Sequence, residues 1–160
     1  MCKLLRQGFS FILPITVLII VPLSIEPEIT IKNLPAFLIG VLIMIAGLAL
    51  IGKTISALTR IGDGTLAPWS PTKKLVTNGI YGYVRNPMIL GVLITLLGES
   101  AAILSAQIFK WTIIFFVINN IWFLIYEEPN LEKKFGDQYR EYKKSVPRWI
   151  PNLRSGKSVR

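Results

Sequence analysis

Residues 34–52 read LPAFLIGVLIMIAGLALIG and contain no charged side chain. A helix needs about 20 apolar residues to cross about 30 Å of hydrocarbon. The amphipathic helix of a soluble protein would instead show a polar face that recurs about every 3.6 residues. This stretch has no such face, so it predicts a transmembrane helix rather than the core helix of a soluble domain.

Further apolar blocks lie on both sides of this stretch. They cover residues 8–25, 87–104 and 111–126. The third block of the chain contains Glu99, and a carboxylate is costly deep in a bilayer. We therefore expect this helix to be short, or Glu99 to lie at the far membrane boundary. No A-x-A-like cleavage pattern follows the first block, which favours an uncleaved helix over a signal peptide.

The expected fold is all-α: a single domain over residues 1–160, built as an integral membrane bundle of about four helices. The expected transmembrane helices cover about residues 8–25, 34–58, 87–104 and 108–127. Residues 59–86 and 128–160 are expected to be cytoplasmic segments, with an interfacial helix near the C-terminus.

The composition agrees with a membrane protein and excludes several common sites. Of the 160 residues 52% are hydrophobic and 17% are charged, and mean hydropathy is +0.53. One cysteine cannot form an internal disulfide, and a chain without histidine has no Ser-His-Asp triad or His-based metal site. No metal site is expected.

The basic residues predict the topology. The net charge is +9, and 16 of the 18 Lys and Arg residues precede the first block, lie between the second and third, or follow the fourth. Positive charge concentrates in cytoplasmic segments, so both termini are expected on the cytoplasmic side of the membrane. Because these residues flank apolar blocks, lipid head groups explain the charge better than nucleic acid does.

Two polar segments contain more turn-forming and charged residues than a simple connection between helices needs. Residues 62–91 contain many Gly, Pro and Tyr residues, too many turn formers for one helix. Residues 127–151 begin with Glu127 and Glu128. Pro129 suits the first turn of a new helix, expected over 130–144 with an interruption at Gly136.

Both segments carry motifs that resemble one family. Residues 79–91, GIYGYVRNPMILG, resemble the G-x-Y-x-x-x-R-[HN]-P-x-x-x-G signature of small integral-membrane methyltransferases. These are the isoprenylcysteine carboxyl methyltransferase and phospholipid methyltransferase families. Residues 127–142 and the following VPRWIP at 146–151 are similar to their second signature. The chain departs from the pattern at Asn86, where many members have His, and at Ile89, where many have Tyr. The Arg-Asn-Pro variant resembles that of prokaryotic members, which implies a prokaryotic cytoplasmic membrane.

The resemblance implies an S-adenosylmethionine pocket at the cytoplasmic membrane interface, built by both signatures and unlike a Rossmann-type fold. It implies catalytic roles for Arg85, Glu128 and Arg148. The cofactor-binding residues that it implies are Tyr81, Tyr83, Val84, Arg85, Asn86, Pro87, Gly91, Glu127, Glu128 and Tyr142.

Elementary chemistry refines these roles. Adjacent helical residues point about 100° apart, so we expect one of Glu127 and Glu128 to contact the cofactor and the other to pair with a basic residue. Asn86 and Pro87 are typical of a helix start. Arg85 could clamp a carboxylate or phosphate, or simply snorkel toward the head groups.

The positions of other polar and aromatic residues predict their roles. Asn119 and Asn120 lie inside the fourth block, so we expect them first to pack against other helices and, as the alternative, to line a substrate tunnel. Trp149 is expected to be an interfacial anchor, and Tyr139 to help close the pocket.

The main functional hypothesis is methyl transfer from S-adenosylmethionine to a lipidic or lipid-linked acceptor, an isoprenylcysteine-like carboxylate or a phospholipid amine. The alternatives are an NADPH-dependent membrane reductase of the sterol-reductase type and a non-enzymatic membrane scaffold. The expected partners are membrane lipids and a lipophilic substrate. The sequence leaves the acceptor and the oligomeric state open.

Overall fold

The computed structural model describes residues 14–61 and 74–151, and every regular element in these two ranges is a helix. The first elements within the described residues are a π-turn η1 (Thr16–Ile20) and a short helix α2 (Val21–Ile25). The remaining elements are α3 (Leu34–Ile61), the 3-10 turn η2 (Gly79–Gly82), α4 (Pro87–Ile103), α5 (Ala106–Trp122), the π-turn η3 (Phe123–Glu127), α6 (Glu128–Phe135) and α7 (Asp137–Ser145).

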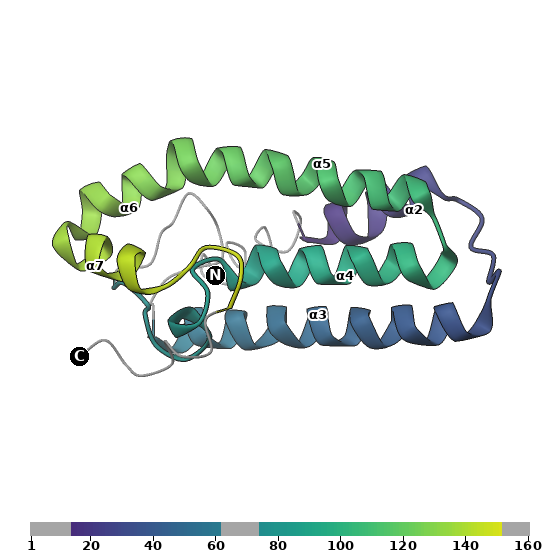
Figure 1. Ribbon diagram of the computed structural model, residues 1–160, viewed down its shortest axis with the longest axis horizontal. Helices are drawn as coiled ribbons and strands as arrows, with labels where there is room; N and C mark the ends of the chain where they lie inside the picture. Colours follow the sequence, from purple (N-terminus) through teal and green to yellow (C-terminus); the bar gives the residue numbers. More distant parts are fainter. Residues whose placement is uncertain (1–13, 62–73, 152–160) are drawn as a thin grey trace, which may run out of the picture.

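Helices α3, α4 and α5 run along the length of the molecule (Figure 1). The connections from α2 to α3 and from α4 to α5 lie at one end of the bundle. The end of α3, the start of α4 and helices α6 and α7 gather at the other. Residues more than 60 positions apart in the sequence therefore meet at this second end, as Tyr81 and Tyr142 do.

Two helices are long and apolar enough to cross a membrane: residues Leu34–Leu58 and the continuous helix Ala106–Phe135. Pro87–Ile103 and Thr16–Ile25 are shorter apolar helices. The helical class is thus confirmed, with two of the four expected spans. Residues 8–13 of the first expected span lie outside the described residues.

Glycines set the distance between α3 and α4. A methyl group added at Gly98 would lie 2.7 Å from the Gly40 carbonyl oxygen, and one added at Gly91 would lie 3.0 Å from that of Gly47. The two helix backbones can approach this closely only because no side chain separates them, as is common between membrane helices. Ile51, Val92 and Leu96 form the adjoining core.

Apolar side chains also cover the outside of the bundle. Along α3, Leu42 is 66% exposed and Ile45 is 57% exposed, and Ile118 of α5 is 56% exposed. Large contiguous apolar surfaces are rare on soluble monomers. These faces are therefore suited to contact lipid.

The fourth apolar block forms a longer helix than expected. Pro129 lies in the first turn of α6, as predicted, but α6 continues α5 through η3 instead of following a break. A proline has no amide hydrogen, and its ring clashes with the carbonyl four residues earlier in a regular α-helix. The wider π-turn before Pro129 relieves that conflict, and Gly136, at φ 54°, ends α6 as predicted.

Candidate active site

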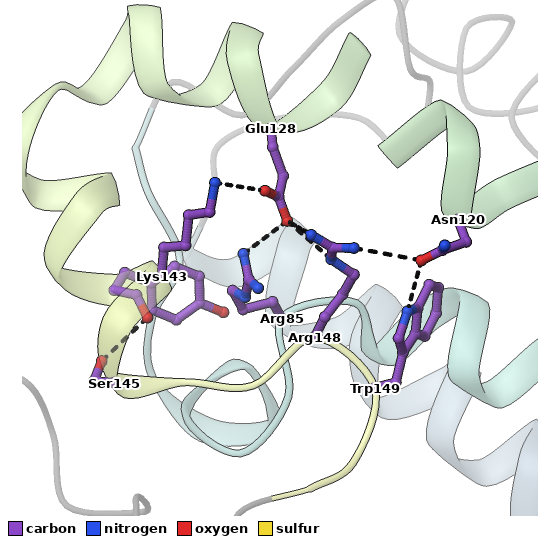
Figure 2. Close-up of polar contacts among 8 residues, drawn as sticks. Arg85, Asn120, Glu128, Lys143, Ser145, Arg148 and Trp149 are labelled. Atoms are coloured by element: carbon purple, nitrogen blue, oxygen red, sulfur yellow. Dashed lines mark hydrogen bonds and ion pairs between the residues drawn. The ribbon is translucent and has the colours of Figure 1, made fainter. Parts of the chain in front are cut away.

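The site centres on one buried carboxylate, Glu128 at the start of α6, whose side chain is 3% exposed. Its Oε1 atom accepts a hydrogen bond from Arg85 Nη1 at 2.8 Å. The same oxygen accepts from Arg148 Nε at 2.9 Å and from Arg148 Nη2 at 2.6 Å. Lys143 Nζ lies 2.8 Å from Oε2. Figure 2 shows the three cations converging on this carboxylate from three different parts of the chain.

The ion pairs leave a surplus of positive charge. Two guanidinium groups and one ammonium share the single charge of Glu128. Burial alone would raise the pKa of the Glu128 carboxyl. The hydrogen bond from Lys143 and the charges of Arg85 and Arg148 outweigh it and hold that pKa below its ordinary value. Glu128 is thus ionised at neutral pH, and the surplus of positively charged groups around it is suited to attract a further anion.

The segment before α4 holds Arg85 in place. The Arg85 backbone N–H donates to the Pro147 carbonyl oxygen at 2.9 Å, which ties the first signature to the second. Asn86 caps α4, because its side-chain oxygen accepts from the Ile89 backbone N–H at 3.4 Å, and Pro87 lies in the first turn. The predicted helix start is confirmed. The Arg85 side chain is 8% exposed, so it is buried rather than extended toward head groups.

Tyrosines of α7 pack beneath the cluster. The Tyr142 hydroxyl donates to the Tyr81 carbonyl oxygen at 2.7 Å, and Tyr139 and Tyr142 pack with Val146. Burial raises the pKa of Tyr81, and the Glu127 charge raises it further. Burial is also the main reason that the pKa of Tyr139 is raised to about 12. The tyrosines are therefore neutral at physiological pH.

Glu127 and Glu128 have different surroundings, as expected for neighbours on a helix. Glu128 is the residue that pairs with basic side chains, whereas Glu127 is exposed. Glu127 nevertheless lies close enough to Tyr81 for its charge to act on that hydroxyl. Glu127 is therefore an exposed residue at the edge of the site.

The other predicted site residues are spread around this centre. Val84 is 2% exposed and Tyr83 is 37% exposed. Gly91 lies in the contact between α3 and α4, where a Cβ atom would approach Ile51 Cγ1 to 2.7 Å. Close helix packing accounts for Gly91, and its role in cofactor binding stays a prediction.

Sequence reasoning missed Lys143 and the hydrogen bonds that the asparagines of α5 make. Nothing distinguishes Lys143 from its neighbours in the basic run of α7 until the fold brings it to Glu128. Asn119 Nδ2 donates to the Phe115 carbonyl of its own helix at 2.8 Å. Asn120 accepts from Arg148 and Trp149 of the C-terminal segment. Among the described residues, these hydrogen bonds tie α5 to itself and to the C-terminal segment, and the expected packing of both side chains against other helices stays a prediction.

Comparison with known proteins identifies the family. Residues 35–138 match the family model described as phospholipid methyltransferase, which is more than half of the chain. The chain belongs to the phospholipid methyltransferase family. The matched range includes Arg85 and Glu128 and ends before Arg148.

Two curated proteins are similar to parts of this family member. One is a protein-S-isoprenylcysteine O-methyltransferase of Schizosaccharomyces pombe, 39% identical over 80 residues, or 48% of this chain. The alignment covers 33% of that relative's length. The other is an uncharacterized protein of Haemophilus influenzae, 38% identical over 63 residues, which are 39% of this chain and all of the relative. No solved structure matches the chain.

Proposed function

We propose that this protein is a membrane-embedded methyltransferase that uses S-adenosylmethionine to methylate a lipidic or lipid-linked acceptor. The observation that carries the proposal is the Glu128 centre. Arg85 of the first signature and Arg148 of the second both bind the same carboxylate oxygen. Two motifs far apart in the sequence thus form one polar centre at the end of an apolar bundle.

The residues present suit the polar groups of S-adenosylmethionine. The surplus positive charge around Glu128 suits the cofactor's carboxylate, and Arg148, whose side chain is 18% exposed, is the more accessible arginine. The exposed carboxylate of Glu127 suits its ammonium or ribose hydroxyls. The buried Nε atom of Arg85 has no hydrogen-bond partner among the described residues, so this guanidinium retains donor capacity.

When bound, S-adenosylmethionine supplies an activated methyl group on a sulfonium. The chain's own residues then have a positioning task. Arg85 and Arg148 orient an anionic group. Glu128 holds both guanidinium groups in place, so that their side chains do not extend into solvent. Fixing the reacting groups before reaction is a large source of rate enhancement. Methyl transfer would join the methyl carbon to the acceptor oxygen or nitrogen, and the electron pair of the broken carbon–sulfur bond would stay on sulfur.

The charges of the centre favour a carboxylate acceptor over an amine. A carboxylate acceptor is ionised at neutral pH and needs a cation to orient it, which the arginines supply. An amine acceptor must also lose a proton, and in a chain without histidine the accessible candidate base is Glu127. The exposed apolar faces of α3 and α5 allow a lipid-anchored acceptor to reach the centre from the bilayer.

The test uses the full chain in lipid nanodiscs and measures S-adenosylmethionine binding by calorimetry. We expect wild type to bind, NADPH not to compete, and Glu127→Gln to weaken binding about tenfold with an unchanged melting temperature. Glu132→Gln is the matched control, because Glu132 lies on α6 but pairs with Arg140 outside the centre. Folded wild-type protein that binds no S-adenosylmethionine would sink the proposal.

A second measurement identifies the acceptor. Membranes from cells that express the protein are supplied with S-adenosylmethionine labelled in its methyl group, and lipids and proteins are then extracted. A carboxyl methyl ester releases labelled methanol in alkali, whereas a methylated head-group amine keeps the label. Alkali-labile label is the expected result, and alkali-stable label on a phospholipid would assign the amine instead.

A further inference from the structure

Asn120 of α5 joins the membrane helix to the C-terminal segment. Its Oδ1 atom accepts a hydrogen bond from Trp149 Nε1 at 3.0 Å and lies 3.4 Å from Arg148 Nη1. The indole and guanidinium groups are donors only, so both bonds require the amide to present its oxygen to them. Figure 2 shows the Arg148 guanidinium between Glu128 on one side and Asn120 on the other.

The π-turn η3 explains how Asn120 and Glu128 come to flank the same arginine. Eight residues separate them, and at about 100° per residue a regular helix would leave the two side chains about 80° apart. A π-turn closes bonds five residues apart and so winds more slowly. The Glu128 backbone N–H bonds to the Phe123 carbonyl in this way. The slower winding brings both side chains toward one face.

The hydrogen bonds of Asn120 with Arg148 and Trp149 form an anchor for the C-terminal segment, and aromatic contacts strengthen this anchor. The Trp149 ring packs edge-on against Phe116, with centroids 5.2 Å apart, and lies 6.4 Å from the ring of Phe123. The guanidinium carbon of Arg148 lies 5.6 Å from the centroid of the Phe123 ring. Arg148 therefore has a ring beneath it, a carboxylate on one side and an amide oxygen on the other.

We propose that Asn120 is a positioning residue, which holds Arg148 in the orientation that receives the anionic group of a ligand. This inference rests on the proposed function, because the ligand used to test it is S-adenosylmethionine. It assigns a role within the reaction to a polar residue in an apolar helix. Without the Asn120 oxygen, the Trp149 indole loses its acceptor and the segment that carries Arg148 loses its polar tie to α5.

The experiment compares isosteric and conservative variants in nanodiscs. Asn120→Leu keeps the branched shape of the side chain but loses the acceptor, and we expect S-adenosylmethionine binding to weaken five- to tenfold. Asn120→Asp keeps an acceptor and should stay within about threefold of wild type. The matched control is Asn119→Leu, because Asn119 bonds only to its own helix backbone among the contacts described. The proposal is overturned if Asn120→Leu binds S-adenosylmethionine as tightly as wild type does. It is also overturned if Asn120→Asp binds as weakly as Asn120→Leu.

A second readout does not depend on the cofactor. Limited trypsin digestion followed by mass spectrometry measures cleavage after Arg148, with cleavage after the exposed Lys144 as internal reference. We expect Asn120→Leu to accelerate Arg148 cleavage at least threefold relative to Lys144, and Asn119→Leu to leave the ratio unchanged. Unchanged cleavage would refute the anchor. If wild type binds no S-adenosylmethionine while the cleavage ratio rises as expected, the proposed function fails and the anchor stands.

If Asn120→Leu does not fold, Trp149→Phe provides the same test from the other side of the bond. Phenylalanine keeps a ring against Phe116 but has no N–H to donate to Asn120. We expect faster cleavage after Arg148 and about threefold weaker S-adenosylmethionine binding. A Trp149→Phe protein that matches wild type in both measurements would overturn the proposal.

Discussion

Replacing Gly47 by alanine should force α3 and α4 apart. A Cβ atom at this position would lie 2.7 Å from both the Gly91 carbonyl oxygen and the Thr95 backbone nitrogen, and it would overlap Thr95 Oγ1. Two of these atoms belong to helix backbone and cannot rotate away. An ordinary contact begins near 3.4 Å, so the helices must separate by several tenths of an ångström.

The expected cost is about 2 kcal/mol, within the range of about 1–3 kcal/mol typical of overpacked cores. Thr95 adds to it, because its hydroxyl donates to the Gly91 carbonyl at 2.9 Å, in the space that the new methyl group would enter. For a chain of this size, 2 kcal/mol corresponds to a fall in melting temperature of about 5 °C.

Gly52→Ala is the matched control on the same helix. A Cβ atom there meets nothing within 4 Å, so alanine adds helix propensity without a clash. Both variants are melted in the same detergent, with circular dichroism as the signal. If Gly47→Ala and Gly52→Ala melt together, close backbone contact does not determine the spacing of α3 and α4, and the reasoning is refuted.

Three further predictions concern polar contacts. Glu128→Gln should destabilise the protein by about 3 kcal/mol, because it leaves buried cations unpaired, whereas Glu132→Gln should hardly change the melting temperature since its pair is exposed. Because the folded-state pKa of Glu128 is lowered, its stabilisation is complete above about pH 4.3 and is lost as pH falls through the folded value. The melting temperatures of wild type and Glu128→Gln should therefore converge toward low pH, and a constant difference would contradict this. Ser105→Ala removes the N-cap of α5 and a 2.6 Å bond to Glu26, so chemical denaturation should show a loss of about 1–2 kcal/mol, and no loss would show that the cap is dispensable.

The sequence predicted the helical class and most helix boundaries. Uncharged stretches of membrane length require α-helix, because a backbone in lipid must satisfy its own hydrogen bonds. Asn86, Pro87 and Gly136 marked helix ends correctly, since capping and backbone freedom act over only a few residues. The two signatures also pointed to Arg85, Glu128 and Arg148, which the structure brings together.

The π-turn at residues 123–127 was not predicted. Its cause is a balance between the proline at 129 and the continued apolar packing of α5, and hydropathy does not measure that balance. Because the turn changes the angular spacing along the helix, it also decides which side chains of α5 and α6 share a face. The role of Asn120 could not be read from the sequence for the same reason.

By itself the sequence determined that this chain is an apolar helical bundle with its charged residues at the ends, because helix formation and membrane preference depend on residues close together in the chain. Only the tertiary structure decided that Glu128 rather than Glu127 carries the ion pairs and that Lys143 joins them. Such a choice depends on which distant segments the close packing of α3 on α4 brings to one end of the bundle. Charge pairing acts over a few ångströms in space, whatever the separation in sequence.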